Sequence, residues 1–173
     1  MTNKEKSIVL IGFMGVGKTT VSKLLAAKLN REFIDIDEVI EKEFNLPVPE
    51  IFQKFGEKVF RDKEKELITR ITKQEGKIIS VGGGAFLQEN IKNECLTNCT
   101  VIYLSISFEN WKDRLSLIID SRPVLQGKTL GEMEELFNKR KAIYANHHLQ
   151  IEVDNKNPEE VVKEILIKGE LKK

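Results

Sequence analysis

The chain has 173 residues, which fits one domain spanning 1–173 and is long enough to bury a core without disulfide or metal staples. Its formal net charge of +1 gives no overall basic bias, so we expect no nucleic-acid partner, and any anion site must arise from a local cluster of positive groups. The longest apolar stretch, Ile8 to Gly17, is too short to span a bilayer and holds three glycines, so we expect no membrane insertion and a cytoplasmic protein. Two cysteines, Cys95 and Cys99, are too few for a disulfide framework and predict reduced side chains.

Short apolar runs alternate along the chain with longer amphipathic segments. The strand candidates are residues 8–11, 33–37, 78–81, 101–104 and 149–153. Apolar residues at helical spacing separate them, and Pro49 and Pro158 can each open a helix at its first turn. Strands alternating with helices predict an α/β domain with a parallel sheet covered on both faces. In such sheets ligands bind beyond the carboxyl ends of the strands, so the loops after the strands are the expected functional segments.

One predicted helix carries a polar exception on its apolar face. Phe60, Leu67, Ile68 and Ile71 fall on that face together with Glu64. A carboxylate at such a position either reaches a site or sits at the edge of the helix.

The first strand candidate runs directly into a phosphate-binding motif. Gly12–Thr19 reads Gly-Phe-Met-Gly-Val-Gly-Lys-Thr and matches G-x-x-x-x-G-K-[ST] in full, between a strand and a helix. Glycines let several backbone N–H groups face phosphate oxygens, Lys18 can reach the β- and γ-phosphates, and the Thr19 hydroxyl can hold Mg²⁺. The expected nucleotide-binding residues in this P-loop are Gly12, Gly15, Val16, Gly17, Lys18, Thr19 and Thr20.

A P-loop by itself does not separate a kinase from a GTPase or an ATPase motor. The guanine-reading N-K-x-D sequence is absent, and the third strand candidate continues Ser80-Val81-Gly82-Gly83-Gly84 where a motor usually has an acidic residue. Both observations favour a small-molecule kinase.

Several further segments, in order, resemble the shikimate kinase family over about residues 8–158. These are the P-loop, Asp35-Ile36-Asp37, Gly56-Glu57 to Phe60-Arg61 with Glu64, Gly82-Gly83-Gly84, Arg122-Pro123, and Arg140 with Tyr144. The resemblance implies a three-layer α/β/α kinase fold of the nucleoside-monophosphate-kinase type. Its five parallel strands would be ordered 2-3-1-4-5, with a substrate-binding region at about 37–64 and a mobile lid at about 117–128. It also implies a monomer that transfers the γ-phosphate of ATP to the 3-hydroxyl of shikimate, a step of aromatic amino-acid biosynthesis in bacteria, plants and fungi.

The resemblance assigns roles at the acceptor end of the site. Arg61 and Arg140 would clamp the shikimate carboxylate, because a guanidinium matches a carboxylate with two parallel hydrogen bonds. Glu64 would hold Arg61 in place, and Asp37 would orient the attacking hydroxyl and take up its proton. Lys18, Asp37 and Arg122 are the expected catalytic residues, Arg122 being a lid arginine that neutralises the transferring phosphate.

The remaining expected roles concern the backbone, the metal and the adenine. Gly82, Gly83 and Gly84 would let the backbone approach the substrate closely. Mg²⁺ would be held by Thr19 and, through water, by Asp35 and Ser80. Arg114 is expected on the adenine face. The family resemblance also implies a basic residue near the adenine, in the loop before the last helix; that loop is short here, and either Lys156 or no residue takes the place.

Other interpretations stay open at this point. Read alone, Asp37 before Glu38-Val39-Ile40 fits a helix N-cap, which would not exclude a catalytic role. The lid is apolar apart from Arg122 and departs from the family pattern. A gluconate or nucleoside-monophosphate kinase of the same architecture is one alternative. A catalytically inactive relative that binds shikimate or nucleotide is another, although four intact residues argue against it: Lys18, Asp37, Arg61 and Arg140.

Overall fold

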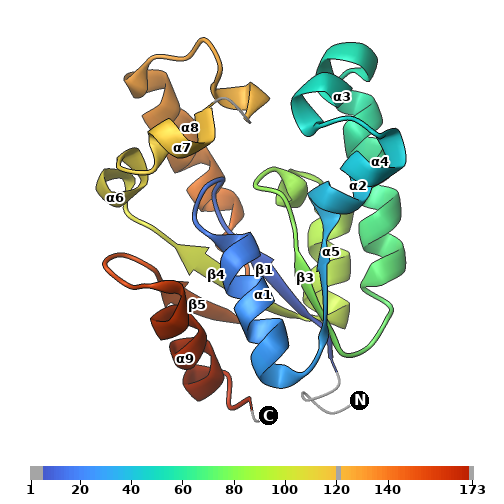
Figure 1. Ribbon diagram of the computed structural model, residues 1–173, viewed down its shortest axis with the longest axis vertical. Coiled ribbons are helices and arrows are strands. Elements are labelled where there is room, and N and C mark those ends of the chain that lie inside the picture. The colour runs from blue at the N-terminus through green and yellow to red at the C-terminus, as the bar shows by residue number, and fades with distance from the viewer. Residues whose placement is uncertain (1–5, 120–121, 172–173) are drawn as a thin grey trace.

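The computed structural model describes residues 6–119 and 122–171, and its centre is a parallel β-sheet (Figure 1). Among these residues five strands pair in the order β2-β3-β1-β4-β5. They are β1 (Ile8–Ile11), β2 (Glu32–Asp35), β3 (Lys77–Ser80), β4 (Thr100–Ser105) and β5 (Leu149–Glu152). The parallel sheet and the strand order expected from the family resemblance are confirmed.

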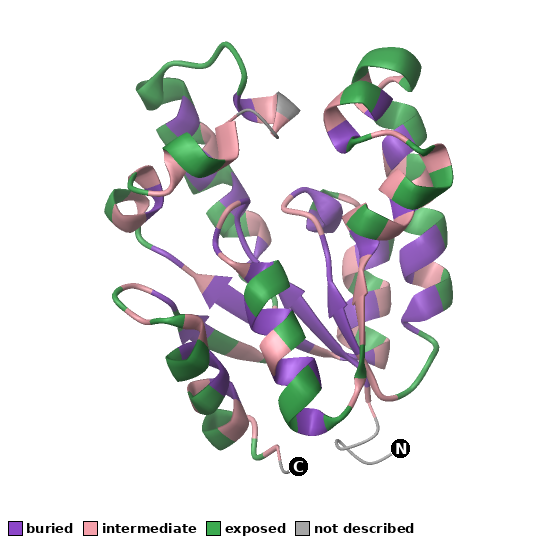
Figure 2. Ribbon diagram, viewed as in Figure 1, coloured by how far each residue is buried: buried purple, intermediate pink, exposed green. Residues whose placement is uncertain are grey.

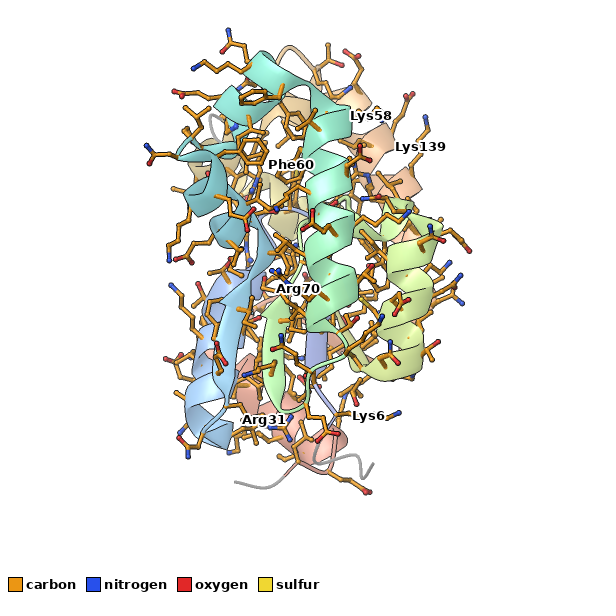
Figure 3. The ribbon with its side chains drawn as sticks, turned by 90° about the vertical axis from the view of Figure 1, so that its right-hand side faces the viewer. Lys6, Arg31, Lys58, Phe60, Arg70 and Lys139 are labelled. Atoms are coloured by element: carbon orange, nitrogen blue, oxygen red, sulfur yellow. The ribbon has the colours of Figure 1, made fainter. Side chains whose placement is uncertain are left out.

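Helices cover both faces of this sheet. They are α1 (Lys18–Leu29), α2 (Ile36–Phe44), α3 (Val48–Phe55), α4 (Glu57–Ile71), α5 (Glu89–Asn98), α6 (Phe108–Lys112), α7 (Leu115–Ile118), α8 (Leu130–Ile143) and α9 (Pro158–Lys168), with short 3₁₀ turns η1 (Ala85–Leu87) and η3 (Pro123–Leu125). Helices α1 and α9 lie together on one face, and α4 and α5 lie on the other (Figures 1 and 3). Within the described ranges no helix is long and apolar enough to cross a membrane.

The core follows from this layering. All four residues of β1 are buried, as are the middle four of β4, because a parallel sheet covered on both faces leaves neither face to solvent (Figure 2). The edge strand β2 is more exposed. Helix α4 presents the expected face to the core, with Phe60, Leu67, Ile68 and Ile71 buried and Glu64 fully buried among them.

The end of β2 differs from the sequence expectation. The strand stops at Asp35, and Ile36 and Asp37 already belong to α2. The N-cap of α2 is Asp35, whose Oδ1 accepts from the Glu38 N–H at 3.1 Å, so the interpretation of Asp37 as the cap is wrong. Ile36 is buried as the first residue of the helix, so the strand ends two residues earlier than the hydrophobic pattern suggested. Asp37 therefore lies in the first turn, out of the strand.

The described part of the expected lid segment contacts the P-loop and α3. Two of its residues, Asp120 and Ser121, lie outside the described residues. In the described part, Ile118 reaches the P-loop, since a Cβ atom built on Gly15 would lie 2.7 Å from its Cδ1. Leu125 is fully buried. Helix α8, which follows, begins with a capping box between Thr129 and Glu132.

Candidate active site

The P-loop, residues Gly12–Thr19, joins the buried end of β1 to the first turn of α1. Gly15 has a φ of 80°, a left-handed conformation that a residue without Cβ adopts at little cost. The Nζ of Lys18 donates to the carbonyl oxygens of Gly12 at 2.7 Å and Phe13 at 3.1 Å. The lysine is thus folded back along the loop, beside the backbone N–H groups at the start of α1. A helix N-terminus next to a buried cation is suited to bind an anion.

Lys18 lies in a crowded electrostatic environment. Its side chain is nearly buried, and that burial, followed by the positive charge of Arg122, lowers the pKa of Lys18 to about 7. The carboxylates of Asp37 and Asp35 oppose this effect, while Arg140 adds to it. These groups come from four elements and from the segment before η3, and they lie close enough to act on Lys18, so a polyanion bound there would meet several cations at once.

The residues expected at a metal ion meet at the ends of neighbouring strands. The Thr19 hydroxyl donates to Asp35 Oδ2 at 2.9 Å. Ser80 is buried and is the register partner of Asp35 in the β2–β3 pair. Hydroxyl and carboxylate oxygens are the hard ligands that Mg²⁺ prefers, and Mg²⁺ is usually held by one or two protein groups together with substrate phosphates and water. The donor set therefore fits Mg²⁺, and the described residues contain no larger cluster of acidic, histidine or cysteine ligands.

A second group of predicted residues lines one cavity, here called the central cavity. Its polar lining consists of Asp37, Arg61, Glu64, Gly82, Gly83, Gly84, Arg122 and Arg140. The structure thus brings together every residue expected at the acceptor end of the site. The cavity also has an apolar wall of Met14, Val48, Phe52, Phe60 and Val124, of which Val48, Phe52 and Phe60 lie within the expected substrate-binding region at about 37–64. These five come from the P-loop, α3, α4 and the lid segment, and apart from Val48 and Phe52, which are four positions apart on α3, no spacing in the sequence links them.

Arg61 is fixed from two sides. Its Nη1 donates to Glu64 Oε1 at 2.9 Å. Its Nη2 lies close to the backbone of Gly84, since a Cβ atom built on that glycine would be only 2.5 Å from it. Gln88 Nε2 donates to Glu64 Oε1 at 3.1 Å and to the Arg61 carbonyl at 3.2 Å, a contact that the sequence did not predict. Burial raises the pKa of Glu64 to about 7, although the charge of Arg61 lowers it. The expected pairing of Glu64 with Arg61 is present in the structure. Figure 3 views α4 from outside, with Phe60 on the side toward α2 and α3.

Asp37 faces the central cavity from the first turn of α2. Its Oδ2 lies 3.9 Å from Arg122 Nη1. Its Oδ1 lies 3.0 Å from the Cβ position of Gly82, and within the described part of the chain this oxygen and Arg122 Nε have no hydrogen-bond partner. Burial, then the nearby Asp35, raises the pKa of Asp37, while Arg122 and Lys18 lower it. A buried carboxylate oxygen without a partner is costly, and a ligand hydroxyl would supply the missing donor.

The opposite side of the cavity is formed by α8. Arg140 is 5% exposed, which is unusual for arginine and requires compensating polar contacts. One turn later, the buried Tyr144 hydroxyl donates to the carbonyl of Gly83. Burial raises the pKa of Tyr144, whereas Arg140 beside it lowers it. The tyrosine thus connects α8 to the glycine loop after β3.

The P-loop also borders a second hollow, here called the Arg114 pocket. It is lined by Gly15, Val16, Gly17, Thr20, Val21, Arg114, Leu117, Ile118, Val153, Lys156, Pro158 and Val161. Both residues expected near an adenine are present, Arg114 from one side and Lys156 from the other. Lys156 is bonded to the Glu152 carbonyl and to Glu164 Oε2. Residues of the P-loop line both cavities, Met14 the central cavity and Gly15 to Gly17 the Arg114 pocket, so a ligand on the P-loop could extend between the two.

Comparisons with known proteins agree with this arrangement. The family model described as shikimate kinase matches residues 14–169. A shikimate kinase of Bacillus subtilis is 57% identical over 159 residues, covering 91% of this chain and 86% of that protein. The crystal structure of the Aquifex aeolicus shikimate kinase superposes with a TM-score of 0.83 at 37% identity, covering 95% of this chain and 96% of that one. The Acinetobacter baumannii shikimate kinase in complex with shikimate gives a TM-score of 0.88 at 31% identity, with 96% of each chain covered. Sequence, fold and site geometry point the same way, and this chain belongs to the shikimate kinase family.

Proposed function

We propose that this chain transfers the γ-phosphate of ATP to the 3-hydroxyl of shikimate, giving shikimate 3-phosphate and ADP. The observation that supports the proposal best is the central cavity. It combines the buried Arg140 and the partly buried Arg61 with a carboxylate oxygen of Asp37 that lacks a partner among the described residues. A small acid with ring hydroxyls, such as shikimate, offers a carboxylate to the arginines and a hydroxyl to Asp37.

The two ends of the substrate would be bound in different ways. The carboxylate would meet the guanidinium of Arg61, which Glu64 and Gly84 already hold in place, and that of Arg140. The ring would lie against the apolar wall of Phe52, Phe60 and Val124. Fixing both ends leaves one hydroxyl close to Asp37, and such positioning accounts for a large part of the barrier reduction in a two-substrate reaction.

The nucleotide would lie across the P-loop, with its adenine in the Arg114 pocket and its phosphates at the start of α1. Lys18 would leave the carbonyl oxygens of Gly12 and Phe13 and pair with the β- and γ-phosphates. Thr19 and Asp35 would hold Mg²⁺, which would supply positive charge to stabilise the phosphates. Arg122 would turn from Asp37 to the transferring phosphate, which frees Asp37 to orient the attacking hydroxyl and accept its proton.

Phosphoryl transfer depends mostly on positioning and on stabilisation of charge, so each cation near the reacting phosphate would contribute separately. The described part of the lid would exclude water when it closes, which limits hydrolysis of ATP. The single domain over 1–173, the monomeric state and the cytoplasmic location remain predictions from the sequence.

A coupled assay of ADP release over a panel of acceptors tests this proposal. We expect ATP consumption with shikimate, and none above background with gluconate or with nucleoside monophosphates. The Lys18→Ala variant is the blank for contaminating kinases. Turnover of gluconate or a nucleoside monophosphate would assign the chain another acceptor. Binding of ATP without turnover of any acceptor would indicate an inactive relative.

A further inference from the structure

Five consecutive carbonyl groups of the P-loop, those of residues 12–16, accept hydrogen bonds from side chains of the protein. Those of Gly12 and Phe13 accept from Lys18. The Met14 carbonyl accepts from the indole N–H of Trp111 at 2.9 Å. The carbonyls of Gly15 and Val16 accept from Arg114 Nη1 at 3.3 and 2.8 Å. Lys18 and Arg114 are charged, have several donors, and could turn to a bound phosphate or adenine instead. The indole is neutral and has one donor, which the Met14 carbonyl already occupies.

The peptide between Met14 and Gly15 is the one that Trp111 holds. In a planar trans peptide the C=O of one residue and the N–H of the next point in opposite directions. Anchoring the Met14 carbonyl therefore aims the Gly15 N–H to the other side of the peptide. Because Gly15 has a φ of 80° and no Cβ, this peptide could flip at low cost unless something retained it.

Trp111 is suited to retain it because its ring is buried and packed against three other aromatic rings. The side chain is fully buried. Its ring contacts Phe13 of the P-loop, Phe108 of α6 and Phe137 of α8, at centroid distances of 5.2, 5.6 and 6.2 Å. Aromatic contacts on several sides fix the plane of the indole and hence the direction of its N–H. The sequence analysis had left this residue out of the site, since it has no motif.

The position of Trp111 also joins the P-loop to the lid. Its backbone carbonyl accepts from the Arg114 N–H at 2.9 Å, and α7 with the start of the expected lid follows immediately. Ile118 of that segment lies against Gly15. Trp111 and Arg114, three positions apart, thus donate to the carbonyls of three successive P-loop residues, 14–16.

We propose that Trp111 is a positioning residue for the nucleotide. Its indole N–H holds the Met14–Gly15 peptide in the orientation that presents the Gly15 N–H to the phosphates of ATP. This inference rests on the proposed function, because it requires that the P-loop bind a nucleoside triphosphate. It adds a residue outside the motif to the groups that determine phosphate affinity.

The chain contains one tryptophan, so a single atom can be changed without mutation. Growth of a tryptophan auxotroph on the benzothiophene analogue of tryptophan replaces the indole N–H by sulfur and preserves the shape of the ring. We expect Kd to rise by about 3- to 10-fold for ATP and by the same factor for inorganic tripolyphosphate. This is the size of effect expected when one buried hydrogen bond is lost. Kd for shikimate should change by less than about 2-fold, because Arg61 and Arg140 do not depend on this peptide.

A matched control separates positioning from general destabilisation. Ser7 is buried at the far end of β1, where its hydroxyl donates to the Gln74 carbonyl and accepts from the Lys77 N–H. Ser7→Ala should lower the melting temperature as much as the analogue does, or more, and leave both phosphate affinities unchanged. Trp111→Phe, which is easier to prepare, should show the same pattern as the analogue with a larger loss of stability.

Two results would overturn the inference. One is unchanged affinity for ATP in the analogue-containing protein, and the other is a loss for ATP that tripolyphosphate does not share, which would place the effect at the adenine. In either case, phosphorylation of shikimate by the parent protein would leave the proposed function intact. A parent protein that bound neither ATP nor tripolyphosphate would contradict the proposed function itself.

Discussion

Arg61 offers the sharpest test of substrate recognition. Its side chain is 17% exposed, with Nη1 bonded to Glu64 and Nη2 against the backbone of Gly84. The change Arg61→Lys keeps the positive charge but replaces a planar fork by a single ammonium. A lysine can retain the pair with Glu64 or reach the substrate carboxylate, and it cannot reproduce both with the same geometry.

The expected loss follows from this geometry. One charge-assisted hydrogen bond is worth about 1.5–3 kcal/mol, so kcat/KM for shikimate should fall by roughly 10- to 150-fold. Kd for ATP should stay within about 2-fold, because the P-loop lies on the other side of the reacting phosphate. Arg70→Lys is the matched control, because Arg70 is an exposed residue at the far end of α4 (Figure 3) and its replacement should leave both quantities unchanged.

A double cycle identifies the group that Arg61 recognises. The second arm uses a shikimate analogue with an amide in place of the carboxylate, measured as kcat/KM with the parent enzyme and with Arg61→Lys. The parent should use the amide poorly, and the mutation should penalise the amide much less than shikimate, since the contact is already lost. Simple addition of the two losses would refute the reasoning. Arg61 would then be a structural partner of Glu64, and the identity of the acceptor would be open again.

Four other outcomes are expected. Lys18→Ala should lower kcat by about 100-fold or more in the coupled assay, because one preorganised electrostatic contact is lost. Near-normal turnover of this variant would contradict a role of the P-loop in the mechanism. Because burial and Arg122 lower the pKa of Lys18 to about 7 without ligand, and bound phosphates should raise it, ATP binding at about pH 8.5 should take up a proton. Calorimetry in buffers of different ionisation enthalpy measures this uptake, and identical heats in all buffers would contradict it. Proteolysis within residues 117–128 should slow when nucleotide and shikimate are both bound, whereas equal cleavage of free and bound protein would argue that this segment is no lid. Gly84→Ala places a methyl group 2.5 Å from Arg61 Nη2 and should raise KM for shikimate by roughly 10-fold without changing Kd for ATP. Gly131→Ala, in an open position on α8, is its control. An equal rise of KM in both variants would exclude displacement of Arg61 as the cause.

Much of the site could be predicted because its signals are local. The P-loop motif is contiguous and lies between a buried strand and a helix, so a short stretch of sequence specifies both the backbone conformation and the groups that bind phosphate. Glu64 on α4 stood out in the same way, as a polar exception to a helical period, although the pattern left open whether its carboxylate reaches a site or sits at the edge of the helix. The roles of Arg61, Gly82–Gly84 and Arg140 came from family resemblance, because nothing in their spacing places them in one cavity.

What only the tertiary structure decided concerns contacts between distant segments. The end of β2 depended on which carboxylate meets the Glu38 N–H, and hydrophobic pattern could not choose between Asp35 and Asp37. Gln88 reaches Glu64 across 24 positions of the chain, and Trp111 reaches Met14 across 97. An apolar or amide side chain has no pattern that reveals its partner, because such contacts depend on how the strands order themselves in the sheet and on where each crossover returns the chain. The sequence by itself therefore determined the P-loop and its place between a strand and a helix, and the folded chain determined what surrounds it.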